Sequence, residues 1–161
     1  GQAPLGRPPR GIERDFAVAT FSGSRPDLFV VDRGVERERV ELTVFSGESN
    51  YAKKALKVKL PVRGMGSPLW SLDVGRTEGS RPDLVFVTRK GASGLPEVHV
   101  LSGESRYQQF AYQRPLDTDF PRRGTRAVLG SSLGRPTLYV VSLSGRPVVR
   151  LVPVGPQTPP S

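Results

Sequence analysis

The sequence predicts an all-β fold made of repeated four-stranded antiparallel units, about three in number and the last of them incomplete. Ser-Arg-Pro-Asp-Leu occurs at residues 24–28 and again at 80–84, and Ser-Gly-Glu-Ser-x-Tyr occurs at 46–51 and again at 102–107. Both phrases recur after 56 residues, a period typical of solenoids, propellers or arrays. The 18 glycines and 16 prolines punctuate many short apolar runs, which favours strands joined by frequent turns.

Composition narrows the classes of function. The 161 residues suffice for one ordinary domain with a core, and they contain no cysteine, which excludes disulfides, thiolate catalysis and cysteine zinc sites. The net charge of +9 favours anionic partners such as nucleic acid, acidic glycans or cell-wall polymers. The alternative is a solvated surface, because the basic residues are dispersed among 15 acids. No apolar run approaches the roughly 18 residues that span a bilayer, so we expect no membrane-spanning segment.

The first repeat follows an extended arm. Residues 1–13 are rich in proline and glycine without apolar periodicity, which predicts the arm. The first repeat, residues 14–68, then gives four predicted strands, at residues 15–20, 28–33, 40–45 and 52–62.

The fourth of these strands has one apolar and one cationic side. Apolar residues and lysines alternate along it as Leu56, Lys57, Val58, Lys59 and Leu60. This period of two predicts one buried face, and lysines on such a strand commonly protect an exposed sheet edge from unwanted pairing. The alternative is that the lysines of this segment grip an anion. They are Lys53, Lys54, Lys57 and Lys59.

The later repeats follow the same plan. The second repeat, residues 69–124, gives predicted strands at 69–74, 84–88, 97–101 and 107–114. The third, residues 125–155, is shortened and gives predicted strands at 127–133, 139–143 and 148–154. Residues 156–161 form a tail. The predicted pattern is four, four and three strands. The apolar runs Val30–Val31 and Val85–Val87 do not alternate, which indicates strands buried on both faces.

Three segments of the second repeat resemble a known family. They are Trp70 to Val74, Arg81 to Val87, and Glu97 to Gln108. Together they resemble the FG-GAP/VCBS-type repeats of integrin-like β-propellers, especially forms in secreted actinobacterial proteins. The resemblance spans residues 14–154, and it implies four-stranded blades around an axis with binding surfaces on their loops. It also implies an extracellular, mature chain whose signal peptide has been removed.

The resemblance further implies a calcium loop between the first two strands of each blade, but this sequence departs from that pattern. The positions upstream of Asp27 hold Ala19, Phe21 and Gly23. Those upstream of Asp83 hold Gly75, Thr77 and Gly79. Calcium needs several oxygen ligands, so we expect metal-free turns in which each Asp accepts backbone N–H bonds, and Thr137 replaces the Asp in the third copy. Asp73 and Glu78 are the alternative source of ligands at the second loop.

The chain shows no pattern of catalytic residues. His99 is the only histidine and lies between two valines of a predicted strand, so we expect a packed or surface residue. One histidine without cysteine cannot form a nucleophilic triad or a histidine-rich metal site. Most acids recur at equivalent positions, as Glu48 and Glu104 do, which favours structural roles over a paired-carboxylate hydrolase. We expect no enzyme and no cofactor.

Candidate binding residues remain. Tyr51 and Tyr107 recur and are interpreted as packing residues, whereas Trp70 has Arg14 as its counterpart and is the best aromatic candidate for a ligand. The remaining candidates are the four lysines above and the basic pair Arg122 and Arg123.

The predicted function is a non-enzymatic extracellular binding or assembly module for a glycan or protein partner. The alternative is a basic structural subunit of a large assembly that contacts nucleic acid. Closed propellers have four to eight blades, and this chain encodes at most three. We therefore expect a homo-oligomer, or blades from another chain, to complete a ring.

Overall fold

The computed structural model describes residues 12–34, 39–62, 69–77, 79–88, 94–116, 125–142 and 147–154. These segments contain no helix and form three antiparallel sheets. Sheet 1 contains β1 (Ile12–Ala19), β2 (Asp27–Gly34), β3 (Arg39–Phe45) and β4 (Lys54–Lys59). Sheet 2 contains β5 (Leu69–Gly75), β6 (Asp83–Thr88), β7 (Glu97–Leu101) and β8 (Phe110–Pro115). Sheet 3 contains β9 (Thr125–Ser132), β10 (Arg135–Ser142) and β11 (Val148–Pro153).

The predicted all-β class and the pattern of four, four and three strands are confirmed in this described part of the chain. In each sheet the strands pair in chain order, so every connection joins neighbours. In the described part of the chain, no helix is long and apolar enough to cross a membrane.

The fourth strands begin later than predicted. Positions 52 and 107 were expected to start them, but the strands begin at Lys54 and Phe110. The turn ahead of each strand is longer than its sequence suggests, because both of its last two residues have positive φ angles. These are Asn50 and Tyr51, at 56° and 65°, and Arg106 and Tyr107, at 55° and 65°.

The second strand of sheet 3 begins earlier than predicted, at Arg135 instead of 139. Leu133 and Gly134 both have positive φ, at 52° and 75°, and connect β9 to β10 as a two-residue hairpin loop. Pairing therefore starts at once, with Arg135 opposite Ser132. In the first two repeats a longer loop precedes the equivalent strand. The sequence predicted a loop of that kind in the third repeat too, and this prediction is wrong.

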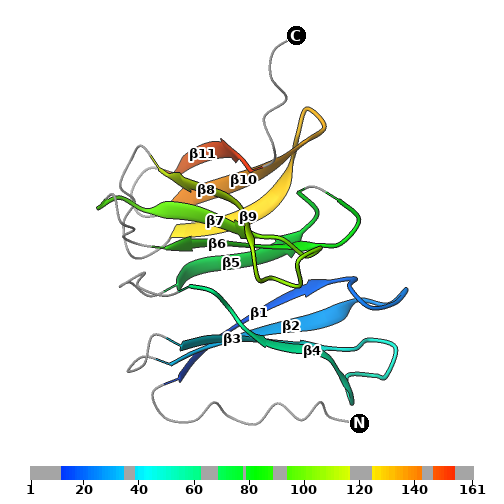
Figure 1. Ribbon diagram of the computed structural model, residues 1–161. Coiled ribbons are helices and arrows are strands. Elements are labelled where there is room, and N and C mark those ends of the chain that lie inside the picture. The colour runs from blue at the N-terminus through cyan, green and yellow to red at the C-terminus, as the bar shows by residue number, and fades with distance from the viewer. Residues whose placement is uncertain are drawn as a thin grey trace.

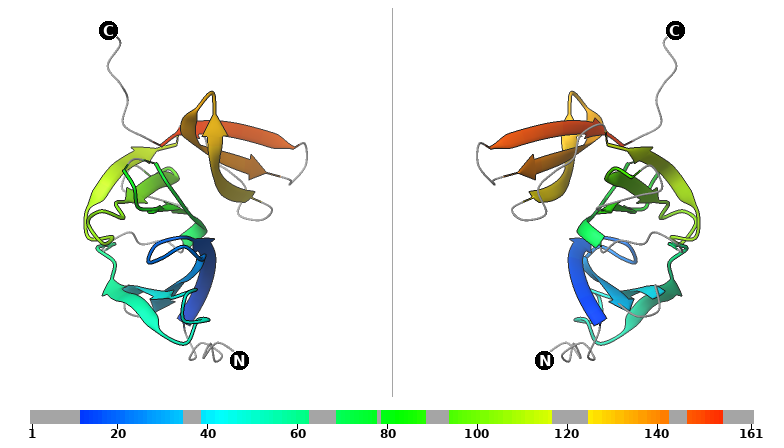
Figure 2. Two further views of the ribbon diagram at one scale, coloured as in Figure 1. Left: turned by 90° about the vertical axis from the view of Figure 1, so that its right-hand side faces the viewer. Right: turned by 90° about the vertical axis from the view of Figure 1, so that its left-hand side faces the viewer.

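The sheets follow one another along the chain and meet through their first strands (Figure 1). β1 contacts β5, and β5 contacts β9. In the first two sheets, β1 and β5 lie on one side of the stack and β4 and β8 on the other (Figure 2). The β5–β9 contact is polar and close. Ser71 Oγ lies 3.0 Å from both the N and the O of Ala127, and Asp73 Oδ2 accepts a 2.8 Å bond from Leu129 N.

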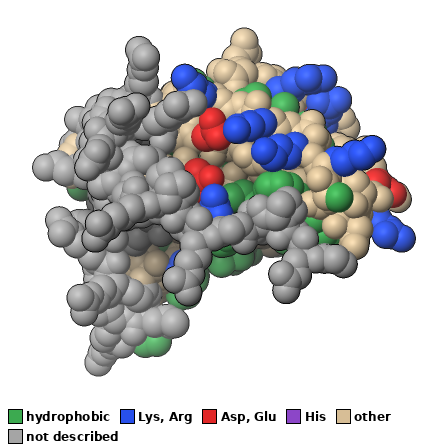
Figure 3. Space-filling view, turned by 90° about the horizontal axis from the view of Figure 1, so that it is seen from below, with side chains coloured by type: hydrophobic (Ala, Val, Ile, Leu, Met, Phe, Trp, Pro, Cys, Tyr) green, Lys and Arg blue, Asp and Glu red, His purple; other side chains and the backbone are tan. Residues whose placement is uncertain are grey.

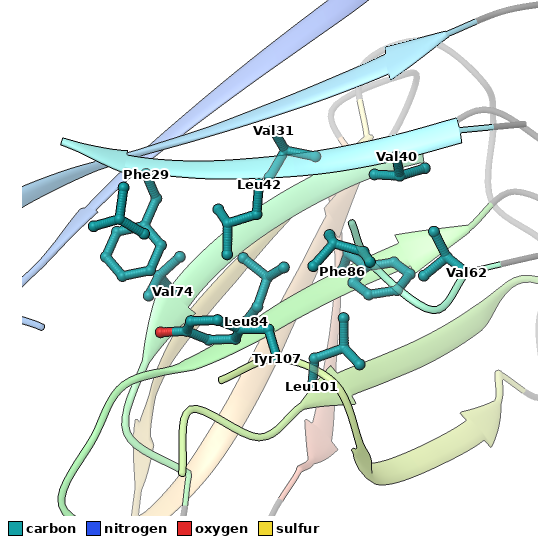
Figure 4. Close-up of a cluster of buried hydrophobic side chains, with 12 residues drawn as sticks. Phe29, Val31, Val40, Leu42, Val62, Val74, Leu84, Phe86, Leu101 and Tyr107 are labelled. Atoms are coloured by element: carbon teal, nitrogen blue, oxygen red, sulfur yellow. The ribbon is translucent and has the colours of Figure 1, made fainter. Parts of the chain in front are cut away.

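Among the described residues, two apolar cores lie between the sheets. The first joins sheets 1 and 2 (Figure 4), and the second joins sheets 2 and 3. Sheet 2 contributes alternate residues to each core: Leu84 and Phe86 to the first, and Val85 and Val87 to the second. β6 is therefore buried on both faces, as its unbroken apolar run predicted.

The two faces of each sheet can be named by chain order. The leading face points toward the next sheet of the chain, and the trailing face points toward the previous one. Sheet 2 covers the leading face of sheet 1, and sheet 3 covers the leading face of sheet 2. The leading-face residues of sheets 1 and 2 include Phe29, Val31, Leu42 and Val44, then Val85, Val87, Val98 and Val100.

Candidate binding surfaces and the repeated turns

The two loops that end in Asp27 and Asp83 have the same construction. Asp27 is fully buried, and its Oδ2 accepts 2.8 Å bonds from the backbone N–H groups of Phe21 and Ser22. Its Oδ1 accepts a 2.8 Å bond from Gly47 N, in the turn between β3 and β4. Each carboxylate therefore joins two turns of its sheet. The expectation that these aspartates accept N–H bonds within their own turns is confirmed.

Asp83 repeats this arrangement. Its Oδ1 accepts a 2.8 Å bond from Gly103 N, and its Oδ2 accepts bonds from the N and Oγ1 of Thr77, at 3.1 and 2.6 Å. A Cβ on Gly103 would lie 2.2 Å from the carbonyl oxygen of Pro82, so only glycine fits this approach. Pro26 and Pro82 directly precede β2 and β6. The prediction that they occupy equivalent turns is confirmed.

Glu48 and Glu104 hold the other side of the same loops. Glu48 Oε1 accepts bonds from the N and Oγ of Ser24 and from Arg25 N, at 2.8–3.0 Å. Glu104 Oε1 makes the same three bonds to Ser80 and Arg81. Hydrogen bonds from the hydroxyl and N–H of Ser24, and from Arg25 N, lower the pKa of Glu48. The repeated acids therefore hold the loops in shape.

The carboxylates of these loops already accept hydrogen bonds from backbone and hydroxyl donors. Burial tends to raise the pKa of Asp27, but N–H bonds from Gly47, Ser22 and Phe21 outweigh it and lower that pKa. The Phe21 side chain packs against Phe29 and Tyr107, with ring centroids 6.2 and 6.0 Å apart, so it lines the core. Among the described residues, no group of three or more His, Asp or Glu is placed to hold a metal.

Asp73, the alternative calcium ligand, has a different role here. Its Oδ1 accepts a 2.8 Å bond from Val74 N, and its Oδ2 accepts the bond from Leu129 N that joins sheets 2 and 3. Glu78 lies outside the described residues.

We therefore expect calcium to leave the thermal stability unchanged. An ion at either loop would have to displace two or three N–H bonds from a buried carboxylate, and few other oxygen ligands are nearby to replace them. Melting temperatures with 5 mM CaCl₂ and with a chelator measure this directly. A clear rise with calcium that the chelator reverses contradicts the assignment.

His99 is a packed residue of β7. It is almost fully buried, its ring stacks on Phe86 at 5.0 Å, and its Nδ1 lies 3.1 Å from Gln113 Oε1. Its Nε2 lies 3.4 Å from Thr88 Oγ1 and 3.6 Å from Glu97 Oε2. Burial lowers the pKa of His99, and Gln113 and Glu97 only partly oppose this effect. Of the two expected roles, packed or surface, the structure shows the packed one.

This lowered pKa has a consequence for stability. The unfolded chain takes up the proton near the ordinary pKa of 6.5, before the folded chain does. The stabilisation from neutral His99 is therefore complete above pH 6.5 and is lost as the pH falls toward the folded-state pKa. We expect His99→Leu to lose less unfolding free energy than the wild type between pH 7.5 and 5. Urea unfolding at several pH values measures this, and parallel pH profiles would contradict it.

The lysines lie at the edge of sheet 1. In the described part of the chain β4 pairs with β3 alone, so it is an edge strand, with Leu56 and Val58 half-buried and Lys57 and Lys59 exposed. Figure 3 shows basic side chains gathered beside hydrophobic ones on the trailing face of sheet 1. Lys57 Nζ lies 3.6 Å from Glu41 Oε1, so part of this charge is neutralised. The predicted alternation is confirmed, and Lys53 and Lys54 are also exposed.

The side chains of the other candidates, Trp70, Arg122 and Arg123, lie outside the described residues. The backbone of Trp70 lies in β5, at a register shift between Leu69 and Ser71.

An open stack of three units is expected to leave an apolar face exposed at each end, and sheet 3 has such a face, although the sequence did not single out its residues. Val149 and Leu151 of β11 are 56% and 54% exposed, whereas their equivalents in sheet 2, Val98 and Val100, are fully buried. Val128 of β9 lies on the same face and is 53% exposed. The residues of this face can be identified only from the packing of the sheets.

The trailing face of sheet 1 lies at the other end of the stack from the leading face of sheet 3. Val18 of β1 is 61% exposed, whereas its equivalent in β5, Val74, is 7% exposed against sheet 1. Phe16, two residues before Val18, is also exposed. Val18 is thus exposed where its repeat is buried, whereas Val30 and Thr43 of the central strands are buried on the same face of sheet 1.

Comparison of the chain with protein-family models, curated proteins and solved structures finds no match. The likeness to FG-GAP/VCBS-type repeats therefore remains a prediction from the residues quoted above.

Proposed function

We propose that the chain is a non-enzymatic, extracellular assembly module of the β-propeller type, with its three sheets as blades and a protein as its partner. Sequential antiparallel pairing, contact through the first strands and apolar packing between successive sheets all support this assignment. The first strand of each sheet then lies nearest the axis, as in radially repeated propellers.

The observation that carries the proposal is the uncovered leading face of sheet 3. Val128, Val149 and Leu151 contribute exposed apolar side chains from both edges of one sheet. Contiguous apolar surface of this kind marks an interaction site in a soluble protein. Because the equivalent faces of sheets 1 and 2 are buried by a sheet, a protein surface suits it better than a sugar.

A catalytic role has less support. His99 and the repeated acids Asp27, Glu48, Asp83 and Glu104 each make structural hydrogen bonds. The exposed lysines of β4 suit edge protection, so binding of an acidic glycan or nucleic acid is the weaker alternative. Such binding would weaken steeply with salt.

Sedimentation velocity tests the proposal on the wild type and on the double variant Val149→Lys/Leu151→Lys. We expect the wild type to sediment above the 17.5 kDa of one chain at micromolar concentration. The double variant should keep its melting temperature but sediment as one chain, because buried lysines oppose association. Leu133→Lys is the matched control, since Leu133 is a fully exposed apolar residue in the β9–β10 turn. Assembly of the double variant to the same extent as the wild type rules out this face.

A further inference from the structure

The junction between sheets 2 and 3 shows which residues meet when one sheet follows another. At that junction Asp73, on the leading face of β5, accepts a bond from the backbone of Leu129 in β9. Gly75 contributes to the same contact, because a Cβ there would lie 2.6 Å from Leu129 Cδ2. The first strands therefore approach closely at this level.

Strand register identifies the equivalent residues at the two ends of the stack. Val85 of β6 and Tyr139 of β10 are equivalent, because each follows the first leucine of its strand. Asp73 lies opposite Val85, and Val128 lies opposite Tyr139. Val128 is therefore the counterpart of Asp73. Leu129 and Val18 lie opposite Leu138 and Leu28, the first leucines of β10 and β2, so Val18 is the counterpart of Leu129.

We propose that the leading face of sheet 3 binds the trailing face of sheet 1 of a second copy, head to tail, so that Val128 of one copy lies beside Val18 of the other. The inference rests on the proposed function and specifies its partner. Both side chains are exposed, at 53% and 61%, and both are apolar, so their contact needs no buried polar group to be satisfied.

The polarity of the stack argues for this partner. Sheets 1 and 3 lie at opposite ends of the molecule (Figure 1). Sheet 3 exposes its leading face, and sheet 1 exposes its trailing face at β1, where Phe16 and Val18 lie. At both internal junctions a leading face meets a trailing face. A second copy provides the complementary surface at each end. Two copies bring six sheets together, within the range of closed propellers, and a closed ring leaves neither end exposed.

Cysteine crosslinking tests this arrangement, because the chain has no cysteine of its own. Val128→Cys and Val18→Cys are prepared as separate single variants and mixed under mild oxidation. We expect the mixture to form a disulfide-linked pair about tenfold faster than either variant alone, because only the mixture places the two thiols side by side. Leu133→Cys mixed with Val18→Cys is the control for random collision, since Leu133 is equally accessible but lies in the β9–β10 turn.

The outcomes separate this inference from the proposed function. Fast crosslinking of Val128→Cys with itself shows that sheet 3 binds another sheet 3, which overturns the head-to-tail arrangement while assembly stands. If every pair crosslinks at the control rate and the wild type still assembles, the second copy binds elsewhere and the inference fails. Control-rate crosslinking in a chain that sediments at 17.5 kDa overturns both.

Discussion

Replacing Tyr107 with alanine is expected to lower the free energy of unfolding by about 3–5 kcal/mol, the cost of a large aromatic cavity in a packed core. Tyr107 is fully buried, its hydroxyl donates a 2.8 Å bond to Pro82 O, and its ring lies 5.9 Å from that of Phe29 in sheet 1. It thus closes its own turn and packs against the preceding sheet. Burial also raises the pKa of Tyr107, consistent with a dry environment.

Tyr51 is the matched control, because it occupies the same turn of the first repeat and donates a 3.2 Å bond to Pro26 O. It is only half-buried, because in the described part of the chain no sheet packs against the trailing face of sheet 1. We expect Tyr51→Ala to cost about 1 kcal/mol in the dissociated chain. Urea unfolding of both variants at submicromolar concentration gives the comparison. Equal losses would contradict the packing of sheet 2 on sheet 1.

Replacing Asp83 with alanine is expected to cost about 3–5 kcal/mol, because it leaves several buried donors without a partner, each worth about 1–3 kcal/mol and not fully additive. These donors are Gly103 N and the N and Oγ1 of Thr77. Asp27→Ala should have a similar effect, since Asp27 makes the equivalent bonds in sheet 1.

Asp15→Ala provides the control for charge. The carboxylate of Asp15 accepts a bond from the adjacent Phe16 N at the exposed surface, so its loss should change stability by less than about 0.5 kcal/mol. Thermal and urea unfolding of the three variants measure these differences. A small effect at Asp83 combined with a large one at Asp27 would show that the two turns are not equivalent.

Much of the fold follows from the sequence because the repeats reinforce one another. The unbroken apolar run at Val85–Val87 indicated a strand covered on both faces, and the alternation of Lys57 and Val58 indicated an edge strand. The recurrence of Asp27 and Asp83 ahead of apolar runs indicated structural turns. These patterns are local, so strand existence and turn equivalence could both be predicted.

The remaining features depend on contacts between sheets, which no local pattern encodes. The exposure of Val149 and the burial of Val98 have the same sequence signal, and only the presence of a following sheet separates them. The hairpin at Leu133 and Gly134 depends on two positive φ angles. Leucine rarely adopts a positive φ, so the sequence does not predict this turn. The role of Asp73 at the junction with Leu129 could not be predicted either, because it depends on a contact between two sheets.

Native mass spectrometry of the unmodified chain, from 1 to 100 μM, tests the central claim most directly. Head-to-tail closure of two copies predicts one main species at twice the 17.5 kDa of the chain, whose mass does not grow further with concentration because both ends are covered. A folded species at 17.5 kDa throughout this range contradicts the account, and an extending ladder of masses contradicts ring closure.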